Sequence, residues 1–259
     1  MISRCILGSL IFFLFSCNNK SEQKEEQISV NNSSELEDTI ANLNSVQGNV
    51  SFSQVATRPN YVLLTGQPDH RLVTIYKYKE NKNYAANTYS SSSYSDYSYE
   101  DVEDRPRNFM PGIEVLYGYN MLNVAHYDLH TEKLNFLFKK PALIKTLYYP
   151  SLIQDSIDKV PITRNYYLVS VYDEDTNKDT LINKKDLRRF YHFNIDCSVK
   201  TQLIPNDYSV LRSQYDSKND VMYLFAIHDD NRNGTGENKE QIHVFWINLK
   251  NPTVAKRMY

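Results

Sequence analysis

Two stretches in the second half of the chain place side-chain oxygens at nearly every second residue. The first runs from Asp175 to Asp186 and reads Asp-Thr-Asn-Lys-Asp-Thr-Leu-Ile-Asn-Lys-Lys-Asp. The second runs from Asp229 to Glu240 and reads Asp-Asp-Asn-Arg-Asn-Gly-Thr-Gly-Glu-Asn-Lys-Glu. Calcium takes about six to eight oxygen ligands, which alternating acids and amides on a tightly wound loop supply. The spacing therefore predicts two calcium-binding loops.

Both stretches resemble the calcium loop of EF-hand and dockerin proteins. The resemblance implies ligands at positions 1, 3, 5, 7, 9 and 12 of each loop, with a backbone carbonyl at position 7. These positions are Asp175, Asn177, Asp179, Leu181, Asn183 and Asp186 in the first loop, and Asp229, Asn231, Asn233, Thr235, Glu237 and Glu240 in the second. Bound Ca²⁺ would be structural, because it would close long hairpins in a chain with only 7 glycines.

The two loops depart from that pattern in different places. Position 6 calls for a glycine; Gly234 fits, whereas Thr180 is β-branched and resists a positive φ. Position 8 is apolar Ile182 in the first loop but Gly236 in the second. Both loops lie between predicted strands, an arrangement similar to the calcium hairpins of TolB-like exported propeller proteins. The alternative is two solvated hairpin tips, since turns favour Asn and Asp for their own reasons.

The sequence shows no comparable pattern for catalytic, phosphate-binding or zinc sites. The sequence contains no Gly-x-Ser-x-Gly elbow, no phosphate-binding glycine loop, no His-Glu-x-x-His and no cysteine pair with zinc spacing. His126 and His130 would share a strand face, but Asp128 between them indicates ordinary hairpin residues. We therefore predict no catalytic residue and no organic cofactor, and we favour a non-enzyme. A hydrolase acting on envelope glycans or peptides is the alternative, because paired carboxylates leave no fixed spacing.

The elements that must hold these loops are predicted to be strands. Tyr is abundant at 21 residues and Gly is scarce, and aromatic residues fit pleated, half-buried surfaces. Short apolar runs bounded by Asn, Asp, Lys and Pro predict the strands. These runs are Tyr61–Leu64, Leu72–Tyr78, Ile113–Tyr117, Leu122–Leu129, Leu134–Phe138, Tyr166–Tyr172, Phe190–Ile195, Val221–Ile227 and Ile242–Leu249.

An internal repeat connects the two loops. A shift of 54 residues lays Tyr166–Ile195 on Asp220–Leu249 without a gap, strand on strand and loop on loop. Val124–Leu129 and His70–Tyr78 are looser copies. Repeats of roughly 40–55 residues with several strands are typical of propeller blades and stacked β-repeats. We expect an all-β fold of about four such units, a small β-propeller or propeller-like β-repeat array, with a β-sandwich as the alternative.

The first residues predict export. Residues 1–16 combine Arg4 with an apolar core, Ile6–Phe15, that is shorter than the roughly 20 residues of a membrane span. The tetrapeptide Leu14-Phe15-Ser16-Cys17 resembles a bacterial lipobox. This resemblance implies cleavage before Cys17, its modification by acyl chains such as palmitate, and a lipid bilayer as partner. An ordinary secretory signal, leaving a free thiol at Cys17, is the alternative.

The next residues are predicted to be a tether. Residues 17–48 are polar, and Lys24-Glu25-Glu26 resembles the charged tethers of Bacteroidota surface lipoproteins. The repeat domain is expected over 49–259, interrupted by a disordered Tyr- and Ser-rich insertion at 87–108. A functional alternative would stack the tyrosines of this insertion on sugar rings.

The composition of the chain limits the classes of molecule that we expect it to bind. The formal charge of −2 gives no concentrated basic surface for nucleic acid. After cleavage and acylation Cys197 has no partner, so we expect a small apolar role for it and no disulfide framework. The sequence predicts an outer-membrane lipoprotein of the cell envelope, on the periplasmic or the surface face. Its expected role is a non-catalytic binding or assembly module for protein or glycan.

Overall fold

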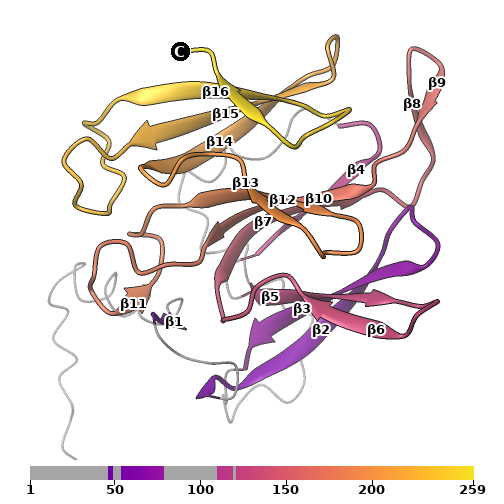
Figure 1. The fold of residues 1–259 in the computed structure, drawn as a ribbon, viewed down its shortest axis with the longest axis horizontal. Coiled ribbons are helices and arrows are strands. Elements are labelled where there is room, and N and C mark those ends of the chain that lie inside the picture. The colour runs from indigo at the N-terminus through magenta and orange to yellow at the C-terminus, as the bar shows by residue number, and fades with distance from the viewer. Residues whose placement is uncertain (1–45, 49–53, 79–109, 119–120) are drawn as a thin grey trace, which may run out of the picture.

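The computed structural model describes residues 46–48, 54–78, 110–118 and 121–259 of the chain (Figure 1). The predicted signal peptide, Cys17, most of the predicted tether and the insertion at 87–108 lie outside these residues. In the described ranges every regular element is a strand, so the prediction of an all-β chain is confirmed. The described part holds no helix of the length and apolarity needed to cross a membrane.

Every pairing between strands in the described ranges is antiparallel. They are β1 (Val46–Gln47), β2 (Thr57–Leu64), β3 (His70–Lys77), β4 (Ile113–Tyr117), β5 (Met121–Asp128), β6 (Lys133–Phe136), β7 (Leu143–Pro150), β8 (Asp155–Ile157), β9 (Val160–Ile162), β10 (Tyr166–Tyr172), β11 (Leu181–Ile182), β12 (Arg189–Asn194), β13 (Lys200–Gln202), β14 (Tyr208–Asp216), β15 (Val221–His228), β16 (Ile242–Asn248) and β17 (Ala255–Arg257).

Three sheets stack face to face (Figure 1). The first sheet has the order β2-β3-β5-β6, the middle sheet β13-β12-β10-β7-β4, and the third sheet β14-β15-β16-β17. Two short pairs, β1-β11 and β8-β9, lie beside the stack. Several antiparallel sheets thus build the described domain, and their stacking leaves an outer face on the first and on the third sheet.

The middle sheet is apolar on both faces, which explains its place in the stack. On β10, Tyr166 and Leu168 pack toward the third sheet, while Tyr167, Val169 and Val171 pack toward the first. Successive side chains of a strand point to opposite faces, so a continuous apolar run suits a strand that is covered on both sides.

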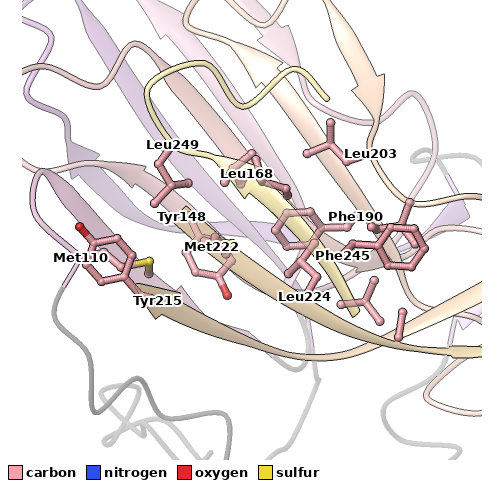
Figure 2. Close-up of a cluster of buried hydrophobic side chains, with 14 of the residues drawn as sticks. Met110, Tyr148, Leu168, Phe190, Leu203, Tyr215, Met222, Leu224, Phe245 and Leu249 are labelled. Carbon is pink, nitrogen blue, oxygen red and sulfur yellow. The ribbon is translucent and has the colours of Figure 1, made fainter. Parts of the chain in front are cut away.

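Figure 2 shows the cluster that joins the middle and third sheets. Leu168 and Phe190 of the middle sheet meet Met222, Leu224 and Phe245 of the third. Phe190, Met222 and Leu224 are at most 1% exposed. Burying a side chain of this size contributes roughly 1.5–3 kcal/mol, so this contact is a main source of stability.

The repeated hairpins occupy equivalent places in the fold. Strands β10 and β12 are inner strands of the middle sheet, and β15 and β16 are the inner strands of the third. In the first sheet, β3 and β5 hold the same place. Within the described ranges there are three such units rather than the expected four.

Four strands of the three sheets, β7, β13, β14 and β17, lie outside the predicted apolar runs. Strand β7 carries Lys145 and Thr146, and β14 carries Arg212 and Gln214, so polar residues obscure their periodicity. Strand β1 begins at Val46, inside the segment predicted as tether. Trp246 is half-buried on the outer face of the third sheet, with the Lys256 ammonium 5.2 Å from its ring.

A buried ion pair joins the middle sheet to the third. The Arg164 guanidinium donates to both Asp220 oxygens at 2.7 and 2.9 Å. It also donates to the carbonyl of Leu249 at 2.8 Å and twice to that of Pro111, at 3.1 and 3.3 Å. Tyr215 donates its hydroxyl to Asp220 at 3.2 Å. Every charged atom of the pair therefore has a partner, as burial requires.

Candidate functional site

The first candidate loop connects β10 to β12 and is wound around the side chain of Asp175. The backbone N–H of Asp179 donates to Asp175 Oδ1 and to Asn177 Oδ1, both at 3.0 Å. The N–H of Thr180 donates to Asp175 Oδ2 at 2.9 Å. Because one hydrogen contacts both, the oxygens of positions 1 and 3 lie side by side.

The last residue of the loop returns to its start. Asp186 Oδ1 accepts the backbone N–H of Thr176 at 2.7 Å and that of Asn177 at 3.3 Å, and its Oδ2 accepts the N–H of Asn183 at 2.8 Å. Asp186 is 1% exposed. Burial raises its pKa, although these hydrogen bonds oppose the rise. Thr176 Oγ1 also lies 3.2 Å from Asp186 Oδ1, so four donors surround a carboxylate that has about four acceptor sites.

The second loop, between β15 and β16, repeats this arrangement. The N–H of Asn233 donates to Asp229 Oδ1 at 3.1 Å and to Asn231 Oδ1 at 2.9 Å, and the N–H of Gly234 donates to Asp229 Oδ2 at 2.9 Å. Glu240 accepts the N–H groups of Asn231, at 3.4 Å, and of Glu237, at 2.9 Å. The backbone N–H groups of positions 3, 5, 6 and 9 thus donate to the side chains of the same positions, 1, 3 and 12, in both loops.

Backbone conformation repeats as well. Positions 4 and 6 have positive φ in both loops: 60° at Lys178 and 75° at Thr180, 57° at Arg232 and 77° at Gly234. Thr180 adopts the angle that its β-branched side chain disfavours, at a cost of about 1–3 kcal/mol. The first loop therefore adopts the shared conformation despite its sequence, not because of it.

The two loops touch each other. Thr176 Oγ1 donates to the carbonyl of Gly234 at 2.6 Å. A Cβ on Gly234 would lie 1.9 Å from the carbonyl oxygen of Thr176, so only glycine fits at this approach. The loops of the middle and third sheets therefore form one cluster at one edge of the stack.

Strand β1 braces the first loop from outside. Its residues pair with positions 7 and 8, Leu181 and Ile182, and the N–H of Gly48 donates to the carbonyl of Thr180 at 2.9 Å. Ile182 is buried with Val46 in a small apolar cluster that also contains Leu122. The apolar residue at position 8 thus anchors the loop to the first and middle sheets.

The side chains of position 9 are less well placed than those of positions 1 and 3. Asn183 Oδ1 accepts the N–H of Lys185 at 2.7 Å. Glu237 accepts from Asn233 Nδ2 at 2.7 Å and pairs with Lys239 at 2.7 Å, a contact that lowers the Glu237 pKa. The described residues contain no group of three or more His, Cys, Asp or Glu side chains arranged for a metal ion. A cation here would also need amide and backbone oxygens.

A histidine flanked by two carboxylates, not predicted from the sequence, lies at the entry to the second loop. Carboxylates contact both ring nitrogens of His228: Asp230 contacts Nδ1 at 2.5 Å, and Asp207 contacts Nε2 at 3.0 Å. The bond to Asp230, followed by that to Asp207, raises the His228 pKa. With a carboxylate on each ring nitrogen, His228 has no free nitrogen with which to act as a general base.

The histidine pair considered from spacing does not form. His130 lies in the exposed turn after β5, where its N–H donates to Asp128 at 2.8 Å. His126 instead meets His70, with His126 Nε2 2.8 Å from His70 Nδ1. Cys197 is a free thiol among the described residues and packs against the cluster between the first and middle sheets. Burial raises its pKa, which fits the predicted apolar role.

Comparison with models of known protein families gives no match, and comparison with curated proteins gives none either.

Proposed function

We propose that this chain is a non-catalytic binding or assembly protein of the bacterial envelope, held to the membrane by acyl chains on Cys17. Its loops Asp175–Asp186 and Asp229–Glu240 bind Ca²⁺, which braces the hairpins of the middle and third sheets. The observation that supports calcium is the shared hydrogen-bond scheme of two loops whose residues agree at few positions.

The proposal is based on the carboxylates that the two loops bury. Asp186 and Asp229 are 1% and 6% exposed, and burying carboxylates is unfavourable unless charge or hydrogen bonds offset it. A divalent ion beside them supplies that charge. Because the loops touch through Thr176 and Gly234, binding in either one stabilises the contact between two sheets.

The finer architecture belongs to the same proposal. We infer that the three sheets are blade-like repeats of a propeller-like array, because each contains an antiparallel run of four strands, β2-β3-β5-β6, β7-β10-β12-β13 and β14-β15-β16-β17, with β4 added to the middle sheet. The loops between β10 and β12 and between β15 and β16 then lie together at one edge, where a protein or a glycan would be bound. The binding role rests on this geometry and on the predicted anchor.

Thermal unfolding with Ca²⁺ or a chelator tests the calcium sites. A ligand at 100 times its Kd stabilises by about 2.7 kcal/mol, which for a domain of this size raises Tm by roughly 5–10 °C. Asp175→Asn with Asp186→Asn should abolish the response of the first loop. Asp229→Asn with Glu240→Gln should do the same for the second.

Asp216→Asn is the matched control. Asp216 also accepts turn N–H groups, from Lys218 and Asn219, but it is only half-buried and its turn lacks the returning carboxylate. Its removal should leave the calcium response intact. A Tm that Ca²⁺ does not move, together with no heat of Ca²⁺ binding in calorimetry, would reject the calcium proposal. The mass of the N-terminal peptide from native membranes tests acylation of Cys17 separately.

A further inference from the structure

The outer face of the third sheet carries two cross-strand rows of side chains. Directly opposed residues share a face. The first row crosses all four strands and consists of Gln214, Tyr223, Trp246 and Lys256. The second row lies two residues further along the strands and consists of Arg212, Phe225 and Val244. Leu224 and Phe245 alternate with these residues and pack into the core, so both rows point outward (Figure 2). We call the two rows together the third-sheet face.

The third-sheet face is open to solvent. Gln214 and Lys256 are exposed, and the remaining side chains of the two rows are half-buried. Tyr223 and Trp246 are directly opposed on neighbouring strands, so their side chains leave the sheet from adjacent positions. Aromatic rings that are half-buried in this way keep apolar surface on which a flat ligand can pack.

Two cations lie against the aromatic rings of this face. The Arg212 guanidinium lies 3.5 Å from the Phe225 ring centroid, and the Lys256 ammonium lies 5.2 Å from that of Trp246. Among the described residues, no carboxylate pairs with either cation, and no acceptor takes a hydrogen bond from the Arg212 guanidinium. Stacking on Phe225 uses the flat side of that group, so its in-plane N–H donors remain available to a ligand.

The acidic residue beside the first row has its partners within its own turn. Asp216 accepts the backbone N–H groups of Lys218 and Asn219 at 3.0 and 3.3 Å, and the Asn219 side-chain amide at 2.8 Å. It also accepts the Tyr223 hydroxyl at 3.4 Å. The Asn219 amide, followed by the backbone donors, lowers the Asp216 pKa. Two cations without carboxylate partners therefore give the face an excess of positive charge, which favours an anionic ligand.

We propose that the third-sheet face binds an acidic polysaccharide, a glycan whose sugar rings carry carboxylate or sulfate groups. Arg212 binds one such group through two parallel hydrogen bonds, and Lys256 binds a second as a point charge. The apolar C–H side of a sugar ring between them packs on Trp246. This inference rests on the binding role proposed above, for which it names a ligand and a second surface, but it needs neither Ca²⁺ nor the acyl anchor.

The spacing of the two cations favours an extended ligand. Arg212 and Lys256 belong to β14 and β17, the two edge strands of the sheet, and to neighbouring rows. With strands about 4.8 Å apart and rows about 6.7 Å apart, their Cα atoms are roughly 16 Å apart. A ligand that contacts both must carry two anionic groups and cross the rings between them. A polysaccharide meets both conditions, whereas a small anion meets neither.

Nucleic acid is the other polyanion with flat groups that stack on aromatic side chains. Proteins that bind it normally present a concentrated basic surface. Here Asp216 borders the face, and the whole chain has a formal charge of −2. An acidic glycan fits this face better, because sugar rings separate its charges as the aromatic residues separate Arg212 from Lys256.

The fluorescence of Trp246 provides a test that reports on this face directly, because the chain contains one tryptophan. The chain from residue 17 with Cys17→Ser is titrated with polygalacturonate, alginate and chondroitin sulfate, each in turn. We expect at least one of them to change the Trp246 emission and to protect the ring from quenching by acrylamide. The response should weaken as salt is added. Neutral dextran should give no response.

Two variants test the assigned contacts. Arg212→Gln and Lys256→Gln should each raise the Kd about tenfold, because each removes a charge-assisted contact. Arg257→Gln is the matched control. Arg257 follows Lys256 on β17, is also exposed and loses the same charge, but it lies opposite Phe245 and therefore faces away from the two rows. This control should leave the Kd unchanged.

Circular dichroism checks folding, and Lys256→Gln, at an exposed residue, keeps the test available if Arg212→Gln unfolds. No response to any of the three polysaccharides overturns the inference. An unchanged Kd in the folded variants, or equal weakening by Arg257→Gln, does so too. Tighter binding of oligothymidylate, or a stable dimer in sedimentation equilibrium that Trp246→Ser dissociates, would assign the face to another partner. A Tm that still responds to Ca²⁺ without glycan binding rejects this inference and leaves the calcium proposal standing.

Discussion

Replacing Arg164 should destabilise this protein more than any surface substitution, because it leaves the buried carboxylate of Asp220 without its ion-pair partner. The Arg164 and Asp220 side chains are 3% and 2% exposed, respectively. In Arg164→Met, Asp220 keeps only the Tyr215 hydroxyl at 3.2 Å among its partners described above. The carbonyl of Leu249 still accepts the Tyr166 hydroxyl at 2.8 Å. The lost hydrogen bonds therefore matter most for the Asp220 carboxylate.

Removing one partner of a buried ion pair costs about 3–5 kcal/mol. For a domain of 150–250 residues that loss corresponds to a fall in Tm of roughly 6–20 °C. Arg164→Met with Asp220→Asn should lose less stability than Arg164→Met alone, because the second substitution removes the unpaired negative charge. Asn is the suitable replacement, since Asp220 has a φ of 53° and Asn tolerates the left-handed region.

Urea unfolding of the parent chain, the two single variants and the double variant measures these differences. Arg164→Lys adds a control that keeps the charge but loses the two-pronged contact to Asp220. A loss below about 1 kcal/mol for Arg164→Met would show that water reaches the pair. Additive losses in the double variant would show that the two residues are not coupled, and either result would refute the reasoning.

Two further predictions concern buried polar groups. Burial and the neighbouring His70 lower the pKa of His126 from 6.5, so the unfolded chain binds more protons as the pH falls through about 6.5. Stability should decline below that pH by up to about 1.4 kcal/mol per pH unit, and His126→Gln should flatten the decline while His130→Gln does not. Asn123, which is 0% exposed, bonds both the N–H and the carbonyl of Phe138, at 3.2 and 2.8 Å. Asn123→Ala should cost about 2–4 kcal/mol in urea unfolding, against under 1 kcal/mol for Asn135→Ala in exposed β6.

Local patterns predicted much of the β structure. Ile113–Tyr117 and Tyr166–Tyr172 are strands with the expected bounds, because their apolar runs end at turn-forming residues. Strand β7 was missed, since Lys145 and Thr146 are buried polar residues inside it. Burial of polar groups depends on partners from distant strands, which a local pattern does not contain.

The candidate loops also combine features that the local sequence predicts with features that depend on distant contacts. Their alternating oxygens could be read from spacing, and the twofold repeat follows from a constant shift along the chain. The contact of Thr176 with Gly234 could not, because it depends on how two sheets stack. The positive φ of Thr180 was expected to be resisted, yet the hydrogen bonds to Asp175 hold it.

The sequence by itself determined the strand-rich class, the repeated hairpin and the oxygen-rich composition of its two loops. These features are encoded in short stretches, where side-chain type and period act on the local backbone. Only the tertiary structure decided which strand lies in the middle, that Arg164 finds Asp220 56 residues away, and that Trp246 shares the outer face of the third sheet with Lys256. Those outcomes depend on contacts between distant segments, whose free energy appears only when the sheets pack together.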